Sequence, residues 1–247
     1  MFVSATTRSF SDKPFAEAAF LLDDLEFDKI EIWMDEASDH LKPSEILRDP
    51  DRFCTRYREA TRLVPVAFCL ENEIRPSDFA ILSRVAKQLR IAQITLPASR
   101  LGTPFNSEID RLRELLRIAS QDGILISIKT KTGHLTEDPH TAIELCQAAR
   151  GLGLTLDPSY YICGPHRGAN FDQVYPFVHH VHLRDTTPSQ VQVPVGLGEM
   201  DYSRLISQLQ RVKYNRALSV EILPELTDDA SRLIELRKMR LLLESLL

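Results

Sequence analysis

The stretch "NSEIDRLRELLRIASQDGILISIKTKTG", residues 106–133, joins two periodic patterns that together decide the fold. Its first part carries apolar residues at helical spacing behind an Asn/Ser start signal, which predicts a helix over 106–121. Its second part alternates, so the three isoleucines of a strand over 124–130 share one face. Lys129 and Lys131 share the opposite face, which places two ammonium groups on one side of the strand's end.

The same succession of helix and strand runs along the whole chain. Strands are predicted over residues 2–6, 29–34, 64–70, 93–98, 124–130, 154–158, 180–185 and 217–223. Helices are predicted over residues 14–25, 43–61, 76–89, 106–121, 138–152, 170–178, 201–212 and 228–246. Strict alternation predicts a parallel sheet of the α/β class, and eight such units in 247 residues match a closed (β/α)8 TIM barrel. Since no linker or low-complexity tract divides the chain, we expect residues 1–247 to form a single domain.

The alternative architecture is an open, doubly wound parallel sheet. Its usual mark is a glycine-rich phosphate-binding turn after the first strand. The segment that follows the first predicted strand here, within "SATTRSFSDKP" (4–14), contains no glycine. The closed barrel is therefore the prediction.

Composition disfavours several classes of function. The formal net charge of −5 lacks the basic excess that a nucleic-acid partner requires. No apolar run approaches the roughly 20 residues of a membrane-spanning helix, and the start of the chain lacks a signal-peptide pattern, so we expect no membrane partner and a cytoplasmic location. The four cysteines are far apart without metal-knuckle spacing and are predicted to be reduced and mostly in the core.

One parity of each barrel strand faces the lumen, and polar residues of that parity near the carboxyl end mark the catalytic mouth. Three such residues stand out: Asp157, His182 and Glu221, each flanked by apolar residues at the end of a late strand. Two carboxylates and an imidazole that converge there predict a divalent metal site with positions open to substrate oxygens.

Five segments, taken in order, resemble the xylose isomerase-like TIM barrels, a superfamily of sugar phosphate isomerases, epimerases and endonuclease IV-type enzymes. They are "KIEIWMD" (29–35), "KTGHLTEDP" (131–139), "GLTLDPSYYI" (153–162), "HHVHLRDTTPSQVQVPVGLGEMDY" (179–202) and "ALSVEILPE" (217–225). The fourth segment is the most specific of them. The resemblance covers nearly the whole chain and implies the same barrel fold.

The resemblance also implies a mechanism. Relatives hold Mn, Mg, Co or Zn with a strand-five Glu and with residues that match Asp157, His182 and Glu221. The metal polarises a carbonyl, and the two glutamates move a proton through an enediolate. The expected activity is that of an isomerase or epimerase in carbohydrate metabolism, acting on a small sugar, sugar phosphate or polyol ketone, with Glu221 as acid/base. A lyase acting on an inositol-type ketone is a variant, while the acidic charge disfavours an abasic-site endonuclease.

The remaining candidates are residues expected to contact a small carbohydrate-like substrate. They are Glu31, Lys131, Tyr160, His166, Arg167, His180 and Arg184. A homo-oligomer is left open by the sequence.

Lys129 stands where the resemblance places the strand-five metal ligand, and four interpretations remain open. A metal is bound and Lys129 is neutral or turned away. Alternatively, Lys129 takes the metal's place between Asp157 and Glu221, which gives a metal-free or catalytically altered barrel that binds a polyol or sugar acid. In the third, Lys129 is a catalytic base or Schiff-base amine. In the fourth, both lysines are solvated residues of an ordinary turn.

Overall fold

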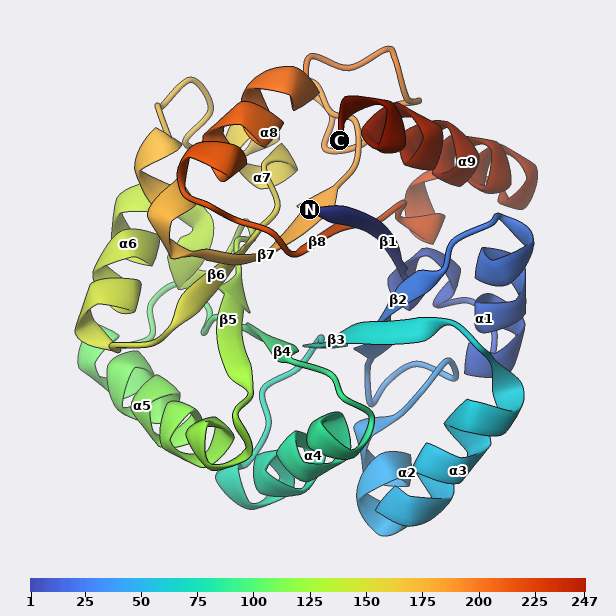
Figure 1. Ribbon diagram of the computed structural model, residues 1–247. Helices are drawn as coiled ribbons and strands as arrows, with labels where there is room; N and C mark the ends of the chain where they lie inside the picture. The colour runs from blue at the N-terminus through green and yellow to red at the C-terminus, as the bar shows by residue number, and fades with distance from the viewer.

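The computed structural model describes residues 1–247 and shows a closed barrel of eight parallel strands. The strands follow one another around the barrel in chain order, and β8 closes it by pairing with β1 (Figure 1). They are β1 (Phe2–Thr6), β2 (Lys29–Met34), β3 (Val64–Leu70), β4 (Gln93–Pro97), β5 (Leu125–Lys129), β6 (Gly153–Leu156), β7 (Val178–Leu183) and β8 (Ala217–Val220). The predicted (β/α)8 fold is thus confirmed, and each observed strand overlaps a predicted one.

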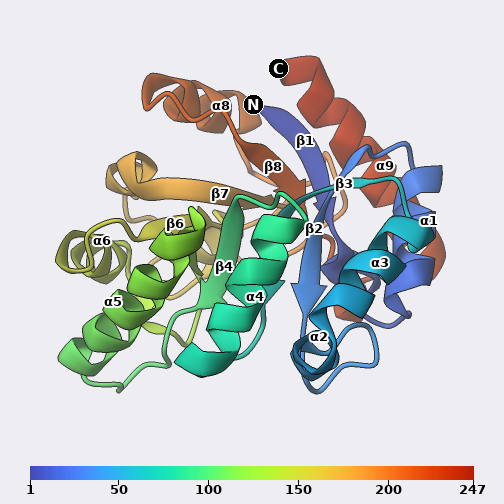
Figure 2. The ribbon, with the colours of Figure 1, turned by 60° about the horizontal axis from the view of Figure 1, so that its bottom comes forward.

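Helices surround the barrel, and Figure 2 shows α4 and α5 side by side on its outside. The α-helices are α1 (Phe15–Asp24), α2 (Pro43–Arg48), α3 (Pro50–Ala60), α4 (Pro76–Gln88), α5 (Phe105–Asp122), α6 (Pro139–Ala148), α7 (Ser159–Cys163), α8 (Tyr202–Arg211) and α9 (Asp229–Leu246). Short 3-10 turns are η1 (Thr7–Phe10), η2 (Leu135–Glu137), η3 (Asp172–Phe177) and η4 (Pro224–Leu226). None of the helices is long and apolar enough to cross a membrane.

The helix predicted over 43–61 is wrong as a single element, because the chain breaks at Asp49 into α2 and α3. Asp49 has a φ of −150° and a ψ of 81°, outside the helical region. A proline disfavours the helical conformation of the residue before it, and Pro50 follows Asp49 directly. The Asp49 side chain then accepts a hydrogen bond from Arg52 N at 3.0 Å and so caps α3.

The helix predicted over 170–178 is also not a regular α-helix, because this segment forms the 3-10 turn η3. Pro176 lies inside it and has no N–H to donate, so a regular α-helix cannot run through it. The short helix α7 lies upstream, in a stretch where the sequence predicted only a loop.

The core follows the alternation that the strands predict. The residues of β2 that face the helices, Ile30, Ile32 and Met34, are fully buried. Inside the barrel the opposite parity is polar and hydrogen bonded, as where Thr155 Oγ1 lies 2.7 Å from Thr95 Oγ1. Side chains of this parity fill the barrel interior, so the site is confined to its mouth.

The cysteines behave as predicted. All four are free, and three of them are buried: Cys54, Cys69 and Cys146. Cys69 differs from the other cysteines because it lies on the lumen face of β3 among charged groups. Burial raises the pKa of its thiol well above the ordinary value.

Candidate functional site

The barrel mouth gathers the polar ends of the strands. Lys129 is the last residue of β5, His182 lies on β7, and Asp157 and Glu221 directly follow β6 and β8. The side chain of Lys129 is 12% exposed, whereas that of Glu221 is 1% exposed. Parity therefore places these four side chains together at the mouth, where Asp157, His182 and Glu221 are fully buried.

Lys129 forms an ion pair with Glu221 across the mouth. Its Nζ donates to both carboxylate oxygens at 2.8 Å. Burial opposes the charge of each group, but the attraction between them outweighs burial, so the pKa of Lys129 is raised and the pKa of Glu221 is held well below its usual range. Both groups are charged at neutral pH.

Arg184 is the cation that joins Asp157 and Glu221, the two carboxylates of the predicted metal-ligand set. Its Nη2 lies 2.6 Å from Asp157 Oδ2 and also donates to Glu221 Oε2. Its Nε donates to the backbone carbonyl of Glu221 at 3.2 Å, and its guanidinium lies 5.5 Å from the ring centre of Tyr160. The interpretation that placed Lys129 between Asp157 and Glu221 is therefore corrected: Lys129 contacts Glu221, and Arg184 bridges the pair.

Glu31 lies at the base of the site between two imidazoles. One of its oxygens is 2.6 Å from His180 Nε2 and 2.8 Å from His182 Nε2. Burial opposes charge on both rings, but Glu31 and Glu221 outweigh it at His182 and raise the pKa of that ring to about 9. At His180 burial prevails and lowers the pKa, so His182 is the charged ring and His180 the neutral one. Glu31 and His180 are buried and paired, which supports a role in positioning His182.

Three side chains of the mouth have the geometry of a metal-ligand set. One ligand atom from each of Asp157, His182 and Glu221 lies within 4.8 Å of the others. Ligand atoms of Glu31, Cys69 and His182 also lie within 4.8 Å of one another and form a second group of three.

The surrounding charges test whether a divalent ion fits the first of these sets. Its two carboxylates are already bonded to Lys129 and Arg184. Two unit charges 4 Å apart interact by about 4 kcal/mol at an effective dielectric constant of about 20, and a divalent ion doubles this repulsion for each cation. The residues in this arrangement do not fit a divalent ion, because Lys129 and Arg184 occupy the carboxylate oxygens that the ion would need.

The rim of the mouth carries a second ion pair that solvent reaches. Lys131 Nζ lies 2.6 Å from Glu71 Oε1, and the two side chains are 32% and 28% exposed. Trp33 Nε1 donates to the other Glu71 oxygen at 3.2 Å. Burial opposes ionisation of Glu71, but Lys131 outweighs it and lowers the pKa of that carboxyl group. Glu71 was not among the predicted site residues, although it has the lumen parity of β3.

The loop after α7 places His166 and Arg167 away from the central ion pairs. His166 lies 3.9 Å from a carboxylate oxygen of Glu137 and 3.9 Å from one of Asp138. Arg167 is exposed and forms no ion pair. Neither side chain forms a hydrogen bond or ion pair with Lys129, Asp157, His182 or Glu221, so a role in substrate contact stays a prediction.

Asp185 organises the long loop between β7 and α8, a role that the sequence reasoning missed. Its Oδ2 accepts hydrogen bonds from Gly196 N at 2.8 Å and Gly198 N at 3.0 Å, while Oδ1 accepts one from Thr186 N at 3.1 Å. A Cβ added at Gly198 would lie 2.0 Å from Asp185 Oδ1. The signal was the Gly-x-Gly pair after "HLRD", where backbone must approach a carboxylate closely.

Comparison with known proteins agrees with the fold and the motifs. A family model described as the xylose isomerase-like TIM barrel matches residues 76–239. A comparison with curated protein sequences finds no match.

Solved structures share the fold over nearly their full length. A xylose isomerase-like TIM barrel protein from Mycobacterium smegmatis, in complex with magnesium, has a TM-score of 0.76 at 16% identity, covering 99% of this chain and 97% of that one. D-psicose 3-epimerase from Clostridium cellulolyticum H10, with D-tagatose, has a TM-score of 0.77 at 10% identity, covering 100% and 99%. The probable 3-DHS dehydratase AsbF from Bacillus anthracis has a TM-score of 0.73 at 15% identity, covering 98% and 99%.

Proposed function

The chain belongs to the xylose isomerase-like TIM barrel family, and we propose that its mouth binds a small polyol or sugar acid without a divalent metal. The observation that carries this proposal is the pair of 2.8 Å contacts from Lys129 to both oxygens of Glu221. An ammonium group replaces coordination bonds with charge-assisted hydrogen bonds, so the site keeps its polarity but lacks a Lewis acid.

The exposed groups of the mouth define what such a ligand meets. Lys129 is partly exposed, and the Lys131–Glu71 pair is more so. A ligand carboxylate can replace the carboxylate partner of Lys129 or Lys131. Glu71 can accept a hydrogen bond from a ligand hydroxyl. A polyhydroxylated compound with a carboxylate at one end satisfies both kinds of group. The D-tagatose in the epimerase structure supports a carbohydrate-like ligand for this fold.

The contacts of Glu221 with Lys129 and Arg184 make the site less suited to proton transfer. Glu221 is the expected acid/base, yet burial is outweighed there by Lys129, His182 and Arg184, which hold its pKa well below the usual range. A carboxylate with a depressed pKa is a weak base, and an efficient base has a pKa near the working pH. We therefore expect epimerase or isomerase activity of the unaltered chain to be low.

A second candidate is the metal-dependent sugar isomerase or epimerase. It is favoured by one observation, namely that ligand atoms of Asp157, His182 and Glu221 lie within 4.8 Å of one another. It requires Lys129 and Arg184 to leave the two carboxylates, which opens room for an ion at the cost of two buried ion pairs.

Calorimetric titration distinguishes the two candidates. A panel of five- and six-carbon sugar acids and the matching polyols is titrated with and without EDTA, against the unaltered protein and Lys129→Met. The matched control is Lys238→Met, which removes an exposed lysine on α9 that pairs with Glu235. We expect sugar-acid binding that EDTA leaves unchanged and that weakens at least ten-fold in Lys129→Met only. Binding that appears only with added Mn²⁺ and is lost with EDTA would favour the second candidate.

A further inference from the structure

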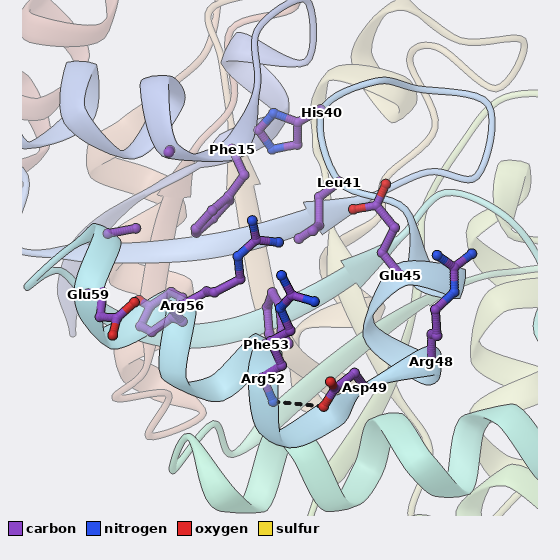
Figure 3. A pocket seen from close by; sticks show the side chains of 13 residues that line it. Phe15, His40, Leu41, Glu45, Arg48, Asp49, Arg52, Phe53, Arg56 and Glu59 are labelled. Atoms are coloured by element: carbon purple, nitrogen blue, oxygen red, sulfur yellow. Dashed lines mark hydrogen bonds between the residues drawn. The ribbon is translucent and has the colours of Figure 1, made fainter.

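A large pocket lies on the outside of the barrel, separate from the mouth. It has a volume of about 700 Å³ and is lined by residues of α1, α2, α3 and the loop after β2 (Figure 3). Pockets that bind small molecules commonly measure roughly 300–1,000 Å³. None of the residues of the Lys129–Glu221 site lines it.

Three arginines line this pocket without a protein partner. Arg48 ends α2, and Arg52 and Arg56 lie four residues apart on one side of α3. Their guanidinium groups form no ion pair and no hydrogen bond, and all three residues are exposed. Arg52 and Arg56 are exposed, unpaired and one helical turn apart, so together they can bind an anionic group of a ligand.

Aromatic side chains form an apolar surface beside the arginines. Phe15 and Phe53 are half-buried, and their ring centres lie 5.9 Å and 6.5 Å from that of Tyr57. Figure 3 shows Arg52 and Arg56 reaching into the same space as Phe15 and Phe53. A flat ring can therefore pack on the aromatic surface while an anionic group of the same molecule meets the guanidiniums.

Three carboxylates complete the lining. Glu45, Asp49 and Glu59 are exposed and form no ion pair, and Asp49 also caps α3. They can accept hydrogen bonds from hydroxyl or amino groups of a ligand. Their negative charge also disfavours a ligand that is anionic throughout, so the anion should be confined to one end.

We propose that this pocket binds a phosphorylated aromatic compound of the size and chemistry of a nucleoside diphosphate. Arg52 and Arg56 bind the phosphates, since a planar guanidinium forms two parallel hydrogen bonds to phosphate oxygens. The ring packs on Phe15 or Phe53, and a carboxylate of the rim accepts from a sugar hydroxyl. This proposal does not depend on what the barrel mouth binds.

The chain contains a reporter close to the pocket. Trp33 is the single tryptophan, and its ring centre lies 6.0 Å from that of His40, which lines the pocket. A ligand that shifts His40 or the loop around it will alter the emission of Trp33.

The test is titration of the full chain with ADP, adenosine and inorganic pyrophosphate, followed by calorimetry and by Trp33 emission. The variant Arg52→Glu/Arg56→Glu reverses both phosphate-binding charges on an exposed helix face. Its matched control is Arg58→Glu on the same helix, because Arg58 lies outside the pocket and donates to Gln88 O.

We expect ADP to bind more tightly than adenosine or pyrophosphate, and its affinity to fall at least ten-fold in the double variant but not in Arg58→Glu. No ADP binding to the unaltered chain, or equal binding to the double variant, would overturn the proposal. Pyrophosphate binding as tight as that of ADP would overturn the role of the aromatic surface.

Discussion

Lys129 and Glu221 face each other across the barrel mouth, with Lys129 Nζ 2.8 Å from each oxygen of the carboxylate. The resemblance to xylose isomerase-like barrels places a metal-binding glutamate at the position of Lys129. The lysine does not turn away from the site. It forms the direct bond to the strand-eight carboxylate that the metal would otherwise make.

Removal of Lys129 should destabilise the protein strongly. Lys129→Met leaves a buried carboxylate with fewer cations, and loss of one partner of a buried pair costs about 3–5 kcal/mol. The control is Lys131→Met, which breaks the partly exposed pair with Glu71 and should cost about 0–1 kcal/mol. Urea unfolding gives the free energy for each variant. Equal, small losses would mean that the Lys129–Glu221 pair does not stabilise the fold.

Substitution of Gly198 should disturb the loop between β7 and α8. In Gly198→Ala the new Cβ meets Asp185 Oδ1 at 2.0 Å, so the backbone must move and the hydrogen bonds to that carboxylate are lost. Hydrogen bonds to charged groups contribute about 1.5–3 kcal/mol, which is the expected loss of unfolding free energy. Leu197→Ala, which truncates a side chain that is 72% exposed, should change it by less than about 0.5 kcal/mol. An unchanged free energy of unfolding in Gly198→Ala would show that Asp185 does not anchor the loop.

His40 should make stability depend on pH. Its Nδ1 donates to Lys13 O at 2.7 Å and its Nε2 accepts from Thr7 Oγ1 at 2.9 Å, an arrangement of the neutral ring, and burial lowers the pKa of His40. The unfolded chain then binds a proton that the folded chain does not, so stability falls as pH drops below about 6.5, by at most about 1.4 kcal/mol per pH unit.

The check on His40 is urea unfolding at pH 7.5 and pH 5.5 in the unaltered protein and in His40→Gln. The variant should lose less stability than the unaltered protein between these two pH values. An identical loss in both proteins would show that His40 is not the group that titrates.

Much of the fold was accessible from the sequence because the strand faces alternate cleanly. In β2, apolar residues that face the helices alternate with residues that face the lumen. This alternation predicts both that the segment is a strand and which of its faces is turned inward. The break between α2 and α3 was missed because apolar spacing continues across Asp49, and the Asp-Pro step was given too little weight. In 170–178, Pro176 was the neglected signal.

The sequence predicted only the part of the site that follows from the alternation of side chains along the strands. Parity places Lys129, Asp157, His182 and Glu221 at one mouth, but it does not say which cation bonds to which carboxylate. Arg184 bridges Asp157 and Glu221 because its long side chain reaches both, and side-chain reach is not visible in a strand pattern. The outer pocket was missed because its arginines lie on α2 and α3, whereas Phe15 and the loop after β2 join them only in the tertiary fold.

The metal content of the purified protein tests the proposed function most directly. The protein is dialysed against Mn²⁺, Mg²⁺, Co²⁺ or Zn²⁺ and measured by elemental analysis, beside Lys129→Glu and Lys129→Met. We predict less than one ion per chain in the unaltered protein, and Mn²⁺ affinity at least ten-fold higher in Lys129→Glu, with a smaller gain in Lys129→Met, which adds no ligand. A full equivalent of metal in the unaltered protein that is lost in Glu221→Ala would contradict the metal-free site.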